Sequence, residues 1–129
     1  MRLLLDTNII VPLARRELER VSAPAHLLLS AGLNEVFVSA ASLWEIAIKV
    51  RIGKLDTMLA LERLGDFCMG LGHSLLSVTP EHAVAELDNE TSTRDSFDRL
   101  LLAQCQVEGM RLVTLDRALA RHPLAWRAK

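Results

Sequence analysis

Hydrophobic and polar positions follow two patterns along the chain. Short continuous apolar runs are typical of buried β-strands, whereas longer segments repeat apolar residues every three or four positions, like one face of an α-helix. Strands that alternate with helices predict an α/β fold with a mostly parallel central sheet. The predicted strands are Arg2–Leu5, Val36–Ser39, Leu75–Thr79 and Leu112–Leu115.

Capping residues predict where the helices between these strands begin and end. Serine, threonine and aspartate accept hydrogen bonds from the free N–H groups of a first turn, and glycine commonly follows a last turn. Helices are expected to begin at Ser22, Ser42, Asp56, Thr79 and Asp95. They are expected to end near Ala31 and Gly32, Gly53, Gly70, and Val107 and Gly109. The polar segment DNETSTR, residues 88–94, is predicted to be a loop.

Length and composition place this pattern in a soluble protein. The chain has 129 residues, of which 50% are hydrophobic and 24% charged, so residues 1–129 are expected to form a single domain. Cys68 and Cys105 lie in apolar helical stretches without the spacing of metal ligands, and we expect two buried free thiols. No apolar run has the length of a membrane span, which favours a cytoplasmic protein that does not bind membranes.

The net charge of −1 hides an asymmetry along the chain. Residues 81–98 carry six acidic residues and one arginine, whereas residues 111–129 carry five basic residues and one aspartate. A basic region beside an acidic cluster fits a protein that binds a polyanion and concentrates carboxylates at one point. Scattered, solvated surface charge explains the same distribution.

Two aspartates come directly after predicted strands. Asp6 follows the first strand and Asp116 follows the last. Parallel sheets bind ligands at the carboxyl ends of their strands, so these side chains could share one edge. The structural alternative is helix capping, by Asp6 or Asn8 for a helix near Ile9 and by Asp116 for a short helix over residues 117–121.

Glu45 lies at the margin of the buried stripe of a predicted helix, in the segment SLWEIAIKV. A structural explanation is strong here, because Ser42 and Glu45 have the spacing of a capping box. Glu45 could also pair with Lys49 one turn later.

Asp98, in the segment DSFDRLLLAQC, is harder to explain by structure alone. It shares a helix face with Leu101, Leu102 and Cys105. Burying a carboxylate on an apolar face costs several kcal/mol, and a nearby helix N-terminus offsets only about 1 kcal/mol.

Together the four acids indicate a metal site. Two carboxylates roughly 5 Å apart repel by about 3 kcal/mol at an effective dielectric constant of 20, so a cluster of four needs a cation. Ligands that are all oxygen, without cysteine or histidine, favour Mg²⁺ or Mn²⁺ over zinc. The candidate ligands are Asp6, Glu45, Asp98 and Asp116.

The segments LLLDTNIIV, SAASLWEIAIKVRIGKL, RDSFDRLLLAQC and LVTLD resemble, in order and spacing, the acidic motifs of PIN-domain ribonucleases. The similarity is closest to VapC-type toxins of toxin–antitoxin pairs and extends from Arg2 to about Ala120. It implies a three-layer α/β/α sandwich with the acids above as the catalytic, metal-binding quartet. Thr7 or Thr114 would supply a supporting hydroxyl, and Asp95 would substitute for or add to Asp98.

The resemblance also implies an activity and partners. The expected activity is metal-dependent endoribonuclease cleavage of a structured RNA, plausibly tRNA, that leaves a 5′-phosphate. Flanking phosphates would contact Lys49, Arg51, Lys54 and the basic C-terminal stretch. With so few aromatic residues, base stacking is expected to contribute little. A small antitoxin would bind the protein, and a homodimer is implied.

The antitoxin could use an apolar groove along one predicted helix, although packing in the core is the commoner role of such a stripe. The groove would be lined by Leu59, Leu61, Leu64 and Phe67.

One departure from the family pattern concerns the third motif. Close relatives often read His-Arg-Asp-Pro-Phe-Asp, whereas this chain has Thr93 and Ser96 in place of the histidine and proline. This change keeps every acid but bears on substrate contacts and on the rigidity of the loop.

Two other functions are open from the sequence. A degenerate PIN domain would bind RNA or a protein partner without cleaving it. An aspartyl-phosphate phosphatase would use the first aspartate as a nucleophile, but it needs a second aspartate where this chain has Asn8.

Overall fold

A computed structural model describes residues 1–91 and 93–128. Its strands form one sheet in which every pair of neighbours is parallel, in the order β3-β2-β1-β4. In the middle of β1, Leu4 pairs in register with Phe37 on one side and Leu112 on the other. The strands are β1 (Arg2–Leu5), β2 (Glu35–Ser39), β3 (Ser74–Leu76) and β4 (Arg111–Val113).

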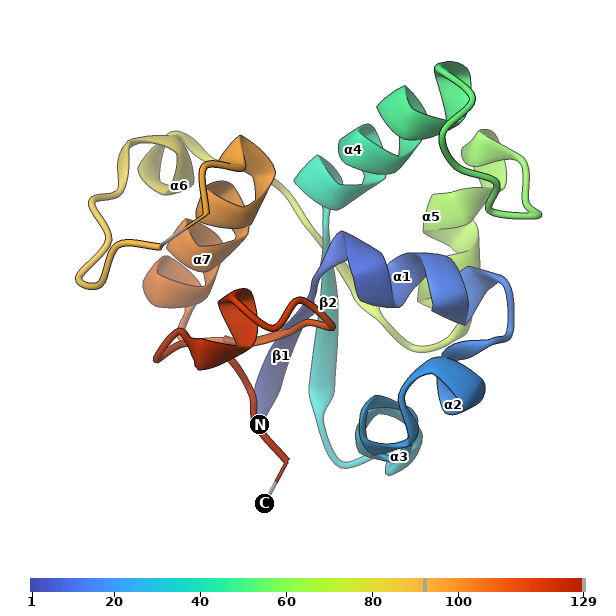
Figure 1. The fold of residues 1–129 in the computed structure, drawn as a ribbon, viewed down its shortest axis with the longest axis horizontal. Coiled ribbons are helices and arrows are strands. Elements are labelled where there is room, and N and C mark those ends of the chain that lie inside the picture. Colours follow the sequence, from blue (N-terminus) through green and yellow to red (C-terminus); the bar gives the residue numbers. More distant parts are fainter. Residues whose placement is uncertain (92, 129) are drawn as a thin grey trace.

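Helices cover both faces of this sheet because the side chains of each strand alternate between two hydrophobic cores. Leu3 and Leu5 pack into one core and Leu4 into the other. Figure 1 shows α6 and α7 on one side of the sheet and α1 to α5 on the other. The helices are α1 (Thr7–Ala14), α2 (Leu18–Val21), α3 (Ala23–Ser30), α4 (Ala40–Arg51), α5 (Leu61–Gly70), α6 (Pro80–Val84) and α7 (Ser96–Glu108), followed by a short 3-10 helix, η1 (Leu119–Arg121).

This arrangement confirms the predicted three-layer α/β/α fold with a parallel central sheet. The predicted range of the first strand is confirmed, but β3 ends at Leu76 and not at Thr79. The reason lies in its neighbour. Leu76 pairs with Ser39, the last residue of β2, so residues beyond Leu76 have no strand to pair with.

Two predicted helix starts were wrong. The α4 helix begins at Ala40, and Ser39 caps it by accepting a hydrogen bond from the N–H of Ala41 at 3.0 Å, so Ser42 lies inside the helix. The α5 helix begins at Leu61 and not at Asp56. The carboxylate of Asp56 instead accepts a hydrogen bond from the N–H of Met58, in a turn that precedes the helix. Met58 has a φ angle of 60°, which no right-handed helix starting at Asp56 could contain.

Three other helix starts agree with the sequence patterns. Ser22, Thr79 and Asp95 cap α3, α6 and α7 through their side chains, and Gly109 ends α7 in the left-handed conformation with φ of 70°. Described residues of segment 88–94 contain no helix or strand, as predicted, while Ser92 lies outside the described residues. Across residues 1–91 and 93–128, no helix combines the length and apolarity needed to cross a bilayer.

Both predicted free thiols are also confirmed. Cys68 packs in one core and Cys105 in the other, each buried and unpaired.

Candidate active site

The carboxyl end of β1 lies at the point where the strand order changes direction, between β1 and β4. From β1 the chain crosses to β2 on one side, whereas β4 lies on the other side. Such a switch point is where open parallel sheets bind their ligands. The N–H of Asp6 donates to the carbonyl of Val113 at 2.9 Å, which fixes the two strand ends together.

Asp6 is buried at this strand end and uses both of its carboxylate oxygens. Its Oδ1 accepts a hydrogen bond from the N–H of Thr7 at 2.7 Å, and its Oδ2 accepts one from the hydroxyl of Thr114 at 2.7 Å. Asp6 therefore caps α1, as the structural alternative predicted, and also lies at the predicted ligand-binding edge. The two interpretations of this residue are compatible.

Glu45 reaches the same place from α4, with only 6% of its surface exposed. Its Oε1 accepts a hydrogen bond from the Thr7 hydroxyl at 2.6 Å, and its Oε2 accepts one from the ammonium group of Lys49 at 2.6 Å. The predicted pairing with Lys49 is confirmed. The capping box with Ser42 is wrong, because the Ser42 hydroxyl is buried and makes no hydrogen bond to any described residue.

Asp98 occupies the first turn of α7 and is half-buried. The hydroxyl of Thr93 donates to its Oδ2 at 3.3 Å. The neighbouring Asp95 is exposed, and its Oδ1 caps the helix by accepting hydrogen bonds from the N–H groups of Phe97 and Asp98.

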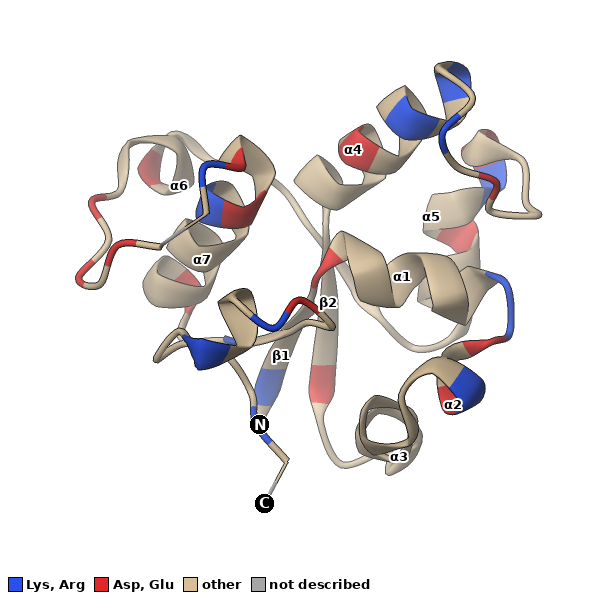
Figure 2. Cartoon of the chain, in the orientation of Figure 1, with Lys and Arg blue, Asp and Glu red and all other residues tan. Residues whose placement is uncertain are grey.

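Asp116 lies in the loop after β4. Its Oδ1 accepts hydrogen bonds from the N–H groups of Ala118 at 2.8 Å and Leu119 at 3.3 Å. These bonds hold the turn that leads into the short helix η1. The helix begins at Leu119 and not at Arg117, and its N-cap is Ala118, so the prediction that Asp116 caps it is wrong. Figure 2 shows acidic positions at the end of β1, on α4, at the start of α7 and after β4, arranged around the same end of the sheet.

Burial and mutual repulsion shift the pKa values of two of these acids. Burial raises the pKa of Asp6, and the charges of Glu45 and Asp116 raise it further, against the opposing hydrogen bonds from Thr114 and Thr7. Burial raises the pKa of Asp98 to about 7, with added repulsion from Asp6, Asp95 and Asp116. The charges of acids from four separate parts of the chain therefore act on one another.

A cleft of about 330 Å³ opens beside Asp6 and Glu45. Thr7, Asn8 and Lys49 complete its polar side, and its other side is apolar. That apolar wall consists of Val11, Pro12 and Leu55. Asp98 and Asp116 do not line this cleft, so only two of the four candidate acids do.

The donors fit a hard cation in their chemistry. Every candidate ligand is a carboxylate oxygen, and the raised pKa values of Asp6 and Asp98 show that adding positive charge would favour their ionised forms. In the described part of the chain, however, no three acidic, histidine or cysteine side chains are grouped closely enough to hold one ion. The charge of Glu45 is compensated instead by the ammonium group of Lys49.

The basic residues predicted to bind phosphate have different surroundings. The hydrogen bond with Glu45 raises the pKa of Lys49, and the charges of Glu45, Asp95 and Asp6 act in the same direction. Arg51 and Lys54 are exposed near the end of α4, where Figure 2 shows basic positions in blue. Arg127 donates to backbone carbonyls of the C-terminal segment, and Lys129 lies outside the described residues.

Two positioning residues were not predicted from the sequence. The side-chain amide of Asn8 donates to the Thr114 hydroxyl at 3.3 Å, and its oxygen accepts from the N–H of Leu115 at 3.0 Å. Asn8 thereby joins α1 to the loop after β4. Thr93, noted only as a departure from the family pattern, contacts Asp98. A polar residue two positions after Asp6 was the available signal for Asn8, but its partner is 106 residues away.

The predicted antitoxin groove serves mainly as core. Leu64 is buried, and Leu59, Leu61 and Phe67 pack against the same cluster, so the structural alternative for this stripe is the better description. Leu59 and Phe67 also line a surface hollow of about 380 Å³ together with Arg63.

The raised pKa of Asp98 predicts a pH-dependent stability difference. In the unfolded chain this pKa is near 3.8, so protonation favours the folded state, and that contribution is lost as the pH rises through about 7. Asp98→Asn should therefore melt at a higher temperature than the wild type at pH 8, with a smaller difference at pH 5. Calorimetry in chelator would measure this difference, with Asp66→Asn, an exposed α5 carboxylate, as the control. An Asp98→Asn advantage that does not change with pH would contradict the prediction.

Comparisons with known proteins agree with this architecture. A family model described as PIN domain matches residues 3–124. A solved structure described as VapBC2 from Rickettsia felis bound to a DNA fragment from their promoter is similar to the chain, with a TM-score of 0.68 and 19% sequence identity. The alignment covers 97% of this chain and 96% of that one. No curated protein matches the sequence.

Proposed function

The chain belongs to the PIN domain family, and from this premise we propose that it is a metal-dependent endoribonuclease, the toxin of a toxin–antitoxin pair. PIN domains are generally nucleases, which favours phosphodiester hydrolysis over phosphoryl transfer to an aspartate. The observation that carries the proposal is the electrostatic interaction of Asp6 with Glu45, Asp98 and Asp116, which adds to burial in raising the pKa of Asp6 and in raising that of Asp98 to about 7. Residues 1–129 are proposed to act as one nuclease domain in the cytoplasm.

In this proposal Mg²⁺ or Mn²⁺ would be held by carboxylates at the end of the sheet. The proposed ligands are Asp6, Glu45, Asp98 and Asp116, with Asp95 as an additional acid. When bound, the ion would orient the phosphate and lower the pKa of a coordinated water. The proposed RNA substrate is a structured one such as tRNA, and the products would carry a 5′-phosphate.

The chain's own side chains prepare this site. The Thr7 and Thr114 hydroxyls hold the carboxylates of Glu45 and Asp6 in fixed orientations. Lys49 holds the second oxygen of Glu45, and it would be released toward phosphate when another cation neutralises that carboxylate. Arg51 and Lys54 are exposed and would neutralise phosphates further along the RNA.

The proposed protein partners are a small antitoxin and a second copy of the chain. The similar Rickettsia felis structure is named as a VapBC2 pair bound to promoter DNA, and its fold is that of this chain. An antitoxin that covers the cleft beside Asp6 would block RNA from the acids. A basic side chain would be suited to this, since the neighbouring carboxylates repel one another.

A second candidate function is a degenerate PIN domain that binds RNA or a partner without cleavage. The Lys49–Glu45 ion pair favours this function, because the Lys49 ammonium group lies 2.6 Å from the Glu45 oxygen that would otherwise bind a metal ion. So does the lack of a three-residue metal cluster in the described residues.

A cleavage assay separates the two functions. We expect the purified chain to cut tRNA in Mg²⁺ or Mn²⁺ and to leave a DNA oligonucleotide of matching sequence intact, with 5′-phosphates on the RNA products. End-labelling and gel analysis would measure both results. RNA binding without cleavage in either ion would favour the degenerate domain.

A further inference from the structure

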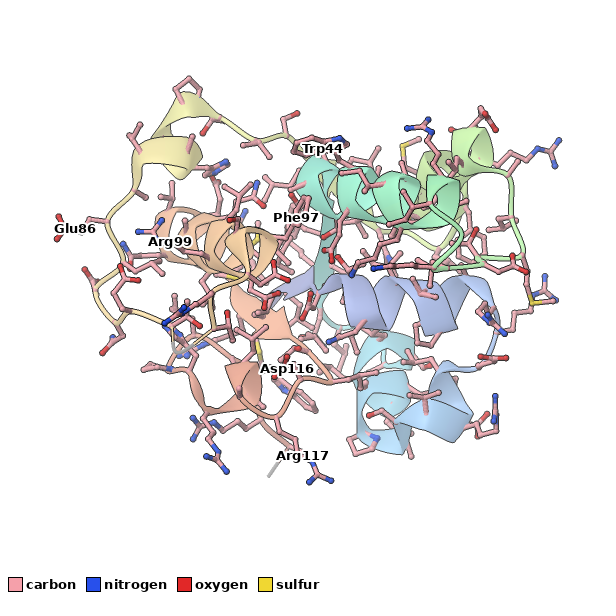
Figure 3. All side chains as sticks on the ribbon, turned by 45° about the horizontal axis from the view of Figure 1, so that its top comes forward. Trp44, Glu86, Phe97, Arg99, Asp116 and Arg117 are labelled. Atoms are coloured by element: carbon pink, nitrogen blue, oxygen red, sulfur yellow. The ribbon has the colours of Figure 1, made fainter. Side chains whose placement is uncertain are left out.

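Two aromatic rings from different helices meet on the surface of the molecule. The rings of Trp44 on α4 and Phe97 on α7 have their centroids 5.6 Å apart and their planes at 71°, an edge-to-face contact. Trp44, one of two tryptophans in the chain, is 63% exposed, and Phe97 is half-buried. Figure 3 shows the pair side by side between α4 and α7.

This aromatic pair lies beside the acids in the chain. Trp44 immediately precedes Glu45, and Phe97 immediately precedes Asp98. The helices that carry them, α4 and α7, also pack against each other. The pair therefore lies where the two helices that supply Glu45 and Asp98 meet, a position that we call the rim of the candidate active site.

The contact with Phe97 orients the tryptophan without covering it. In an edge-to-face pair, one ring meets the other at its edge, so the flat faces of the indole are not both used. Because 63% of Trp44 stays exposed, enough of the ring is open to receive a planar ligand. Such a ring, held in place before the ligand arrives, loses little conformational entropy on binding.

Positive charge lies on the same face of α4. Residues four and seven positions apart share a helix face, so Trp44, Ile48 and Arg51 form one exposed line. Seven residues of helix span about 10 Å, a distance comparable to one or two nucleotides of extended RNA. Lys54 extends the basic surface beyond Arg51. A second copy of the chain that bound through the same face would bring like charges together, and these would repel. A polyanion such as RNA has the opposite charge and would be attracted.

We propose that Trp44, held by its edge-to-face contact with Phe97, is a stacking platform for an unpaired nucleobase of the RNA substrate. The base would lie beside the phosphate presented to the acids, and Arg51 would neutralise a phosphate farther along the strand. The substrate class rests on the proposed function. The platform also revises the expectation that stacking contributes little, since one exposed indole at the rim suffices to select an unstacked base.

RNA binding without cleavage tests the platform. In an Asp98→Asn background, we would titrate a fluorescein-labelled oligo(A) heptanucleotide and measure anisotropy in chelator. Stacking on an aromatic ring is worth enough that Trp44→Ala should weaken binding about 5- to 150-fold, and Trp44→Phe should restore most of it. Ile52→Ala, which removes another exposed apolar side chain of the same segment, is the matched control and should change little.

A second probe identifies what Trp44 contacts. A set of heptamers, each with one abasic site at a different position, would be titrated in the same way. At one position only, the abasic heptamer should bind the protein with Trp44 as weakly as the intact heptamer binds Trp44→Ala. The affinity of that abasic heptamer should not fall further when Trp44→Ala is introduced. Quenching of tryptophan fluorescence by the intact heptamer, lost in Trp44→Ala, would support stacking directly.

The failures of the platform and of the nuclease proposal are distinguishable. Wild-type cleavage of RNA with equal KM for Trp44→Ala and wild type would overturn the platform alone. Trp44-dependent binding in a protein that never cleaves would support the platform and contradict the nuclease. Loss of dimers in Trp44→Ala at unchanged RNA affinity, measured by sedimentation, would overturn the platform and assign this face to a second copy.

Discussion

Replacing Asp98 with asparagine is expected to lower the rate of RNA cleavage by at least about 100-fold while the protein stays folded. Changes in the outer contacts of metal sites already cost 10- to 100-fold, and Asp98 is proposed to contact the ion itself. The fold should survive because the carboxylate is destabilised in place, with burial and repulsion from Asp6 raising its pKa to about 7. A neutral amide of the same shape removes that repulsion.

The matched comparison is with Asp95→Asn, one helical turn away. Asp95 is exposed and caps α7 through its Oδ1, so its replacement should reduce cleavage much less than the replacement of Asp98. Single-turnover cleavage of tRNA at saturating protein would measure both rates, and circular dichroism would check the fold. Full activity in Asp98→Asn with loss in Asp95→Asn would transfer the role of third acid to Asp95.

Divalent ions are expected to raise the melting temperature by about 10 °C, and their removal to abolish cleavage. An ion at 100 times its dissociation constant that binds only the folded protein adds about 2.7 kcal/mol. For a chain of this size, 1 kcal/mol corresponds to roughly 4 °C. The acids supply the reason, because each added positive charge relieves the repulsion among Asp6, Glu45 and Asp116.

Differential scanning calorimetry in Mn²⁺, Mg²⁺ and chelator would measure this shift independently of activity. Asp6→Asn should lose most of the shift, since Asp6 lies at the centre of the cluster and is proposed to be a ligand. Asp66→Asn, on the exposed side of α5, should keep it. Equal melting temperatures in Mn²⁺ and chelator, together with cleavage that persists in chelator, would contradict metal dependence.

The sequence predicted a strand or a helix boundary correctly where the interactions that determine it lie within one short segment. The apolar run of β1 and the caps Ser22, Thr79 and Asp95 depend on neighbours a few residues away, and the structure has them as predicted. Asp56 and Ser42 show the limit of the same reasoning. Each has the chemistry of a cap, but Asp56 accepts from Met58 in a turn that precedes the helix, and Ser39 caps α4.

The candidate site divides in the same way. The order of the acidic motifs and the strand-end position of Asp6 could be read from the chain, whereas β4 ends at Val113 and leaves Asp116 in the loop beyond it. The partners of those acids could not be read from the chain. Thr7 and Glu45 are 38 residues apart, and Thr114 and Asp6 are 108 apart, so their hydrogen bonds exist only once the helices pack on the sheet.

By itself, then, the sequence determined the alternation of strands and helices, the parallel sheet and the four candidate acids, of which Asp6 and Asp116 come after strands and Glu45 and Asp98 lie on helices. These depend on periodicity and capping, which act over a few residues. Only the tertiary structure decided that Thr7 donates to Glu45, that Asn8 holds Thr114, and that Trp44 stands exposed against Phe97. Those contacts depend on distances between elements, which are set by how the whole core packs.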